Sequence, residues 1–250
     1  MRINGSVIGS NVTPSFLSGA TGVWGLQNVD IANRSRTWPT DIITSGLVLF
    51  LDANNTNSYP GSGTSWYDLS GNGNTGTLIN GPTFSSENGG TIVFDGTNDY
   101  VNISSLITGN QSFSWGAWIY PIATGTPVLF GNVSAGLAML SYWDSANNKV
   151  RVGTYGDDKL TSGTAILPST WGYTFWTWNG TTLTSYTNGI ADGTASGFSF
   201  NISGLHTTIG NAVNSQYFNG RISQTLVYNR SLSAAEVLQN YNAVKSRFGL

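Results

Sequence analysis

The chain has 250 residues, enough for one large β-domain or two small ones. Charged residues make up only 9%, against about 25% in ordinary globular proteins, whereas hydrophobic residues reach 39%, enough to form a core. The formal net charge is −2 and the basic residues are scattered, so we expect no nucleic-acid partner. No apolar run approaches the roughly 18 residues of a membrane span, and no apolar stretch follows the charged start, so we expect neither membrane contact nor a signal peptide.

The low charge has two interpretations. A turn-rich β-protein replaces charged residues with Ser, Thr, Asn and Gly, and this chain has 32 glycines. Alternatively, much of the surface is buried in an assembly, where removing charges from water would cost stability. The absence of cysteine agrees with folding in a reducing cytosol.

Residues 1–40 differ from the rest, because their isolated apolar residues show no sustained strand or helix periodicity. An exposed arm that carries Trp24 and Trp38 would be poorly soluble alone, so we expect it to dock either on its own domain or on a neighbouring subunit. We therefore divide the chain into a docking or assembly arm over residues 1–40 and one domain over residues 41–250.

The beginning of this domain predicts strands separated by turns. Residues 47–51 are a continuous apolar run, typical of a buried sandwich strand. Residues 91–94 and 100–103 flank a turn at 95–99, whose Gly and Asn tolerate positive φ.

The later part continues in the same way. Residues 113–120 place bulky side chains on both faces, which suits a central strand in two-layer packing. Residues 182–187 lead into Asn188-Gly189, the signature of a type I′ hairpin. The frequency of such turns predicts an all-β sandwich.

One helix is expected, at the C-terminal end. Ser233 and Glu236 form a capping box, in which each side chain satisfies an amide at the start of the helix. Val237, Tyr241 and Val244 follow at helical spacing, so their apolar stripe should pack on the sandwich.

Three motifs together resemble a known family. They are 66–74 (WYDLSGNGN), 92–101 (IVFDGTNDYV), and a C-terminal set made of 218–222 (FNGRI), 227–230 (VYNR) and 232–237 (LSAAEV). In this order and at this spacing, residues 46–245 resemble the concanavalin A-like, laminin-G-like jelly roll. The resemblance implies a β-sandwich of two antiparallel sheets with a short C-terminal helix. It also implies a scaffold used for recognition and assembly far more often than for catalysis.

The resemblance allows a test for catalysis. Laminarinase relatives on this fold place their catalytic glutamates on one strand, two residues either side of an aspartate. Here the glutamates are Glu87, in a polar loop, and Glu236, in the helix cap, while the adjacent Asp157 and Asp158 would point to opposite faces of a strand. The single histidine, His206, falls in a segment that matches a late family strand. We therefore expect no enzyme activity, no catalytic residues and no required cofactor.

Related domains often hold a calcium ion at the rim of the sandwich. Asp95, Asn98 and Asp99 supply hard oxygen ligands in a Gly-containing turn, which suits calcium. The alternative is that Asp95 and Asn98 only hydrogen-bond local backbone amides in the turn.

Aromatic rings beside polar side chains suit a sugar, because a pyranose stacks its apolar face on a ring while polar groups bind its hydroxyls. Tyr142, Trp143 and Asp144 combine both features in what we expect to be a hairpin loop, so we predict contact with a glycan, with a protein interface as the alternative. The alternating aromatic residues at 171–175 resemble a core strand of the family, so we expect them in the core.

Part of the resemblance is to tailed-bacteriophage structural proteins. Residues 227–233 and 247–250 resemble the ends of their jelly rolls, and residues 22–26 resemble an upstream segment. Phage proteins leave the host by lysis and need neither signal peptide nor disulfides. We therefore interpret the chain as a virion structural protein made in the host cytoplasm, a decoration or adhesin on head or tail. Its expected partners are itself, other virion proteins and a host-surface glycan. The alternative is a carbohydrate-binding module of a bacterial surface protein.

Overall fold

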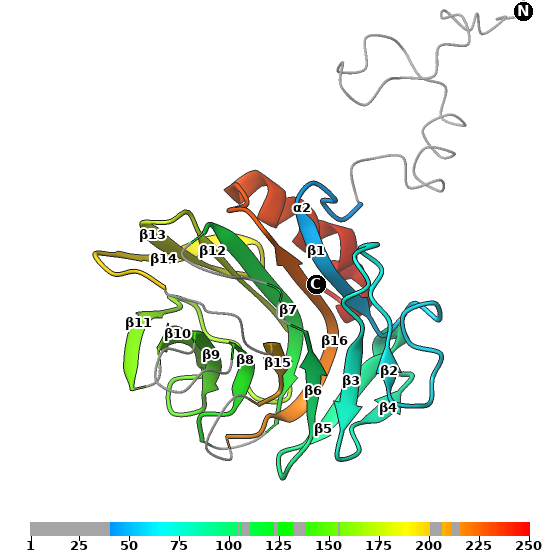
Figure 1. The fold of residues 1–250 in the computed structure, drawn as a ribbon. Helices are drawn as coiled ribbons and strands as arrows, with labels where there is room; N and C mark the ends of the chain where they lie inside the picture. The colour runs from blue at the N-terminus through cyan, green and yellow to red at the C-terminus, as the bar shows by residue number, and fades with distance from the viewer. Residues whose placement is uncertain are drawn as a thin grey trace, which may run out of the picture.

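The computed structural model describes residues 41–104, 106, 111–122, 125–132, 139–154, 156–200, 207–211 and 216–250. Two antiparallel sheets face each other (Figure 1). Sheet A runs, in spatial order, β14 (Ile190–Ser196), β13 (Thr182–Thr187), β12 (Gly172–Trp178), β7 (Phe113–Pro121), β16 (Asn219–Tyr228), β5 (Thr91–Asp95) and β4 (Thr83–Ser85), with β1 (Leu47–Asp52) also paired to β16. Sheet B runs β11 (Asp157–Thr161), β10 (Lys149–Thr154), β9 (Met139–Asp144), β8 (Val128–Asn132), β15 (Thr207–Ile209), β6 (Tyr100–Ile103), β3 (Gly76–Ile79) and β2 (Ser65–Trp66). The predicted sandwich of two antiparallel sheets is confirmed.

The long strand β16 organises sheet A. It pairs with β7 along one edge, while its other edge pairs first with β5 and then with β1. The strands β5 and β6 are separated only by the turn at 95–99, but they belong to different sheets. This turn therefore carries the chain from one layer of the sandwich to the other.

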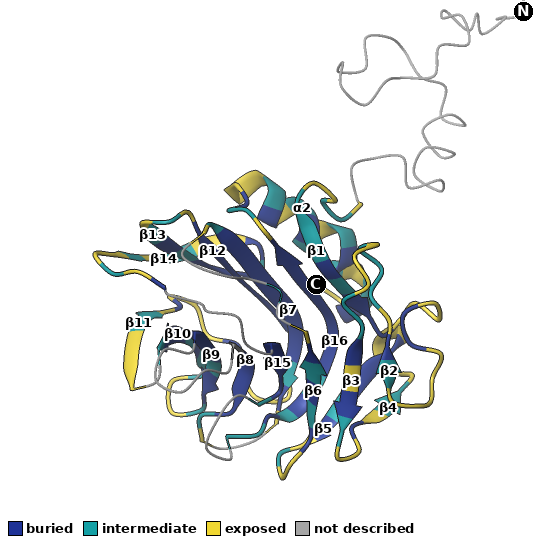
Figure 2. Ribbon diagram, viewed as in Figure 1, coloured by how far each residue is buried: buried dark blue, intermediate teal, exposed yellow. Residues whose placement is uncertain are grey.

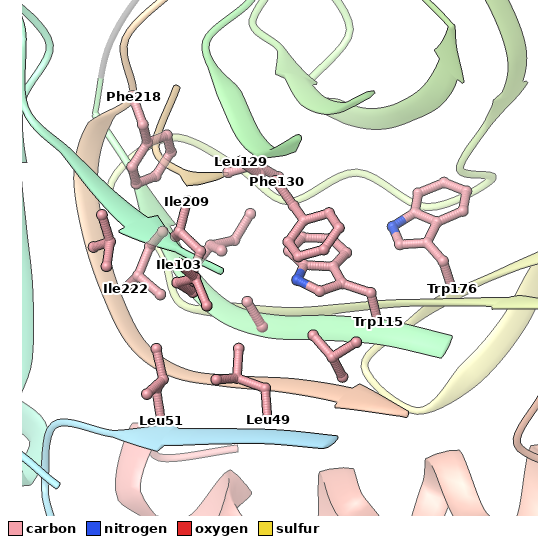
Figure 3. Close-up of a cluster of buried hydrophobic side chains, with 14 of the residues drawn as sticks. Leu49, Leu51, Ile103, Trp115, Leu129, Phe130, Trp176, Ile209, Phe218 and Ile222 are labelled. Atoms are coloured by element: carbon pink, nitrogen blue, oxygen red, sulfur yellow. The ribbon is translucent and has the colours of Figure 1, made fainter. Parts of the chain in front are cut away.

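The space between the sheets is filled by large apolar side chains, and the strands that supply them are buried along most of their length (Figure 2). Trp115 of β7 packs on Phe130 of β8 with ring centroids 4.8 Å apart, which joins the two sheets (Figure 3). The other labelled members are Leu49, Leu51, Ile103, Leu129, Trp176, Ile209, Phe218 and Ile222. Burial of this much apolar surface, worth about 25 cal/mol per Å², is the main source of stability.

A second apolar cluster lies on the outer face of sheet A, under the helix α2 (Ala234–Val244) and the 3₁₀ turn η2 (Lys245–Phe248). Trp118 of β7 points to this side and stacks on Phe248, with ring centroids 4.3 Å apart. Tyr173 and Phe175 are fully buried here, as predicted, whereas Trp171 precedes β12 and is only partly buried. Strand β7 is therefore central, with bulky residues on both faces as predicted.

The capping box at the start of α2 is confirmed. The amide of Glu236 donates to the hydroxyl of Ser233, and the amide of Ser233 donates to the carboxylate of Glu236 at 2.8 Å. Arg230 also donates to both oxygens of Glu236, at 2.7 and 3.1 Å. The cap thereby fixes the direction in which the chain leaves β16.

The structure also explains two local features of the sequence, the turn at Asn188-Gly189 and the motif at 66–74. Asn188 and Gly189, between β13 and β14, have φ values of 51° and 80°, as a type I′ turn requires. In the motif at 66–74, Asp68 accepts hydrogen bonds from the amides of Phe50 at 2.9 Å and Asn74 at 3.0 Å. That motif therefore attaches a surface loop to β1.

The predicted arm, residues 1–40 with Trp24 and Trp38, lies outside the described residues. The segment that follows it contacts α2: the amide of Ile43 donates to Asn240 at 2.9 Å, and Tyr228 donates its hydroxyl to the carbonyl of Ile43 at 2.9 Å. Within the part of the chain that is described, no helix is long and apolar enough to cross a membrane.

Candidate functional site

Tyr142, Trp143 and Asp144 do not form a hairpin loop, so that expectation is wrong. They are the last three residues of strand β9, and the turn to β10 occupies residues 145–148. Because side chains alternate along a strand, Trp143 points into the core while its two neighbours point to the outer face of sheet B.

Trp143 is fully buried and belongs to the core between the sheets. Its indole Nε1 donates to the carbonyl of Ile166 at 3.0 Å, so its polar atom is also satisfied. The prediction that Trp143 contacts a glycan is therefore contradicted. The physical reason is that Trp143 lies on the core face of β9, where burying its apolar surface stabilises the fold.

Tyr142 and Asp144 meet two residues from the neighbouring strands. Arg151 of β10 donates through Nη1 to Asp158 of β11 at 2.8 Å and through Nη2 to Asp144. Tyr142 donates its hydroxyl to the other oxygen of Asp158. We call these four residues the Tyr142 cluster. It lies on the outer face of sheet B, over strands β9, β10 and β11.

The cluster combines buried and accessible groups. The Asp144 side chain is only 5% exposed, whereas those of Arg151 and Asp158 are 29% and 32% exposed. Asp144 also accepts from the amide of Ala146 at 3.0 Å and from Asn147 at 2.7 Å, which closes the turn after β9. The anchored carboxylate of Asp144 therefore holds Nη2 of the guanidinium in place, Asp158 holds Nη1, and the Arg151 side chain stays partly exposed.

Burial and hydrogen bonds shift the pKa values of Tyr142, Asp144 and Arg151. Burial raises the pKa of Tyr142 to about 12, with a further contribution from its bond to Asp158, so the phenol stays neutral. Burial by itself would raise the pKa of Asp144, but the bonds from Asn147, Ala146 and Arg151 outweigh it, and its pKa lies below the usual value. The bonds to Asp158 and Asp144 raise the pKa of Arg151.

The position of the phenol ring follows from its hydrogen bond. Tyr142 is on β9 and Asp158 is on β11, two strand spacings or about 9–10 Å apart in a regular sheet. The tyrosine side chain must therefore reach across β10 instead of standing upright on the sheet. A ring in this position, bordered by a guanidinium and a carboxylate, can stack on the apolar face of a sugar while the border binds its hydroxyls.

The turn at 95–99 is organised by its own backbone. Asp95 accepts from the amides of Thr97 at 2.7 Å and Asn98 at 3.4 Å, and Asp99 accepts from the amide of Asp95 at 3.1 Å. Asp99 is buried, and burial raises its pKa. The carboxylate of Asp95 therefore accepts from the local backbone, as the alternative predicts, and so does that of Asp99. A calcium ion at Asp95, Asn98 and Asp99 stays a prediction.

The other acidic side chains considered for catalysis take part in ion pairs or in the helix cap. Glu87 forms an ion pair with Arg221, and Glu236 belongs to the helix cap. Asp157 pairs with Lys159 on the exposed edge strand, and His206 lies outside the described residues. Across the described parts of the chain, no three His, Cys, Asp or Glu side chains are grouped to hold a metal ion.

Outside the Tyr142 cluster, a second group of partly exposed aromatic residues lies on the outer face of sheet A. There the guanidinium of Arg221 lies over the ring of Tyr120, 5.2 Å from its centroid. Trp171 packs on Phe248 with centroids 4.5 Å apart and donates to Asn88 at 3.0 Å. The Tyr142 phenol, by contrast, is bordered by both a guanidinium and a carboxylate, so we take the Tyr142 cluster as the candidate site.

Arg151 and Asp158 were not predicted as site residues. One sequence signal pointed to Arg151: in Val150-Arg151-Val152, a charged residue alternates with two apolar ones, as expected for a strand with one solvent face. The contacts of Arg151 and Asp158 with each other and with Tyr142 and Asp144 depend on how β9, β10 and β11 pair. No short sequence motif specifies that pairing.

Together, two twisted antiparallel sheets, a capped C-terminal helix and an aromatic–polar cluster on a sheet face define a lectin-like jelly roll. A family model described as the concanavalin A-like lectin/glucanases superfamily matches residues 95–238, more than half of the chain. The chain belongs to this family. No curated protein matches it in sequence.

Solved structures share the fold at low sequence identity. Domain 4 of an extracellular arabinanase from Geobacillus stearothermophilus, solved with arabinotriose, is 17% identical with a TM-score of 0.64, and the match covers 78% of this chain and 98% of that domain. The binding domain of Paraclostridial Mosquitocidal Protein 1 is 16% identical (TM-score 0.65; 80% of this chain, 52% of that one). Trypanosoma rangeli sialidase is 16% identical (TM-score 0.62; 82% and 34%). The chain thus spans about half or less of the last two proteins.

Proposed function

We propose that this chain is a non-enzymatic glycan-binding domain, and that the Tyr142 cluster is its contact face. The observation that carries the proposal is the phenol of Tyr142, which reaches across β10 to Asp158 beside the fixed guanidinium of Arg151. A flat ring with polar groups at its border matches the amphipathic surface of a sugar. Two similar structures support this: the arabinanase domain was solved with arabinotriose, and the Mosquitocidal Protein 1 structure is that of a binding domain.

The absence of catalysis is part of the proposal. The two carboxylates that the structure brings together, Asp144 and Asp158, both accept from Arg151. A glycosidase needs a general acid with a raised pKa, whereas the pKa of Asp144 is lowered. This pair is therefore suited to holding a guanidinium in place, and not to donating a proton.

Replacing one ring tests the contact face. We expect Tyr142→Ala to weaken binding of an array-selected glycan by about tenfold, because the stacking surface is lost. The matched control is Tyr100→Ala, since Tyr100 is another half-buried tyrosine on the outer face of sheet B, at β6. Equal affinities of the wild type and Tyr142→Ala, measured by calorimetry, would contradict the proposal.

We further propose that the domain is a phage virion protein, displayed on head or tail as a decoration or adhesin and associated with itself and other virion proteins. The resemblance of residues 227–233 and 247–250 to jelly rolls of tailed phages supports this role, as does the low content of charged residues. Mass spectrometry of purified particles from the source tests it. The proposal requires that peptides of this chain co-purify with the particles.

The second candidate is a carbohydrate-binding module of a bacterial surface protein. It is favoured by the arabinanase domain, of which the match covers 98%, because that domain is one part of a larger secreted enzyme. A monomer that binds a glycan and is missing from particles would favour this alternative over the virion role.

A further inference from the structure

The charge state of the Tyr142 cluster determines which sugars it can accept. Arg151 is the cation at its centre, and both of its terminal nitrogens already donate to carboxylates: Nη1 to Asp158 at 2.8 Å and Nη2 to Asp144. A guanidinium recognises a carboxylate or sulfate best through two parallel hydrogen bonds from such nitrogens. In this cluster each terminal nitrogen already makes one bond to a carboxylate of the protein, so a ligand anion would have to share the guanidinium with Asp144 and Asp158.

The charges around the ring also cancel. Lys149 lies opposite Asp144 in the register of β9 and β10, on the same face as Arg151, so this face carries two cations and the two anions Asp144 and Asp158. Tyr142 adds no charge, since its pKa is about 12. An anionic sugar would therefore find no net attraction at this face.

The cluster also offers hydrogen-bond acceptors to a ligand. Each oxygen of Asp158 accepts one bond, from Tyr142 or from Arg151, and an ionised carboxylate has about four acceptor positions in total. With its side chain 32% exposed, Asp158 can accept further bonds from ligand hydroxyls. It would repel a ligand carboxylate at the same place.

We infer that the Tyr142 cluster selects uncharged, hydroxyl-rich glycans and discriminates against glycans with carboxylate or sulfate groups. This inference rests on the proposed function, since it concerns the same site. The selectivity comes from the two carboxylates that occupy Arg151.

A glycan array with matched pairs tests the inference on the full chain. The pairs are lactose with 3′-sialyllactose, and methyl-esterified with free oligogalacturonides. We expect the uncharged member of a bound pair to bind about fivefold or more tightly, the effect of one like charge about 4 Å away in water. Binding should be weakened about tenfold in Tyr142→Ala and retained in Tyr100→Ala.

Two aspartate variants test the cause. Asp158→Asn removes one negative charge from the cluster, so we expect the preference for uncharged glycans to fall by about fivefold. The matched control is Asp157→Asn, because the neighbouring Asp157 pairs with Lys159 outside the cluster. An unchanged preference in Asp158→Asn would overturn the inference.

The remaining outcomes separate the two claims. If acidic glycans bind more tightly and this binding needs Tyr142, the contact face stands and the inference about charge falls. If no glycan on the array binds, or if binding does not depend on Tyr142, both the proposed function and the inference fall.

Discussion

The cap of the C-terminal helix gives a stability prediction that the structure makes quantitative. Glu236 accepts from the Ser233 amide and from two nitrogens of Arg230, and these bonds, that of Arg230 above all, lower its pKa from 4.5 to about 2. A shift of this size corresponds to about 3 kcal/mol of stability as an upper bound. Because the side chain is partly exposed, we expect Glu236→Gln to destabilise the fold by about 1–3 kcal/mol at pH 7.

The pH dependence follows from the direction of the shift. A carboxylate whose pKa is lowered by folding stabilises the protein above its unfolded pKa of 4.5, and this stability is lost as the pH falls through its folded pKa of about 2. Urea denaturation at pH 7, 4.5, 3 and 2 should therefore show the difference between wild type and Glu236→Gln shrinking toward zero at the lowest pH.

The other glutamate provides the control for this measurement. Glu87 is paired with Arg221 on the surface, with its side chain 63% exposed, so Glu87→Gln should change stability by less than about 1 kcal/mol. A difference between wild type and Glu236→Gln that is the same at pH 7 and pH 2 would refute the reasoning, because the charge on Glu236 would then not be its source.

Three further predictions follow from the same account. Ser233→Ala should destabilise by about 0.5–2 kcal/mol through loss of the cap, and an unchanged melting temperature would show that the hydroxyl contributes nothing. No hydrolysis of β-glucans should be detected by reducing-sugar assay; turnover that is lost on mutation of a single aspartate would contradict this. Deletion of residues 1–40 should leave a folded, soluble domain that no longer oligomerises or joins particles. An unfolded product, or one that assembles normally, would rule out an assembly arm.

Elements specified by neighbouring residues were predictable from the sequence. The capping box of Ser233 and Glu236 and the type I′ turn at Asn188-Gly189 each depend on a few adjacent residues, and both are confirmed. The two-faced strand at 113–120 was also predictable, since its alternation reflects burial on both sides of sheet A.

Features that depend on distant pairing were not predictable in this way. Arg247 donates to both oxygens of Asp52 at 3.0 and 3.1 Å, although 195 residues separate them. The sequence predicts a loop at Tyr142 and Trp143, and neighbouring residues in a loop are not assigned to opposite faces. Both aromatic residues were therefore candidate glycan contacts. Only the register of β9 with β10 shows that Tyr142 faces Arg151 while Trp143 enters the core.

The central claim is that the outer face over β9, β10 and β11 contacts a glycan. Titration of the ¹⁵N-labelled chain with the glycan that the array selects tests it most directly, by mapping which amide signals shift. We expect the amide signals of Tyr142, Arg151 and Asp158 to shift, with little change in those of α2. Shifts centred instead on the exposed Tyr67, or on Trp171 beside η2, would contradict it.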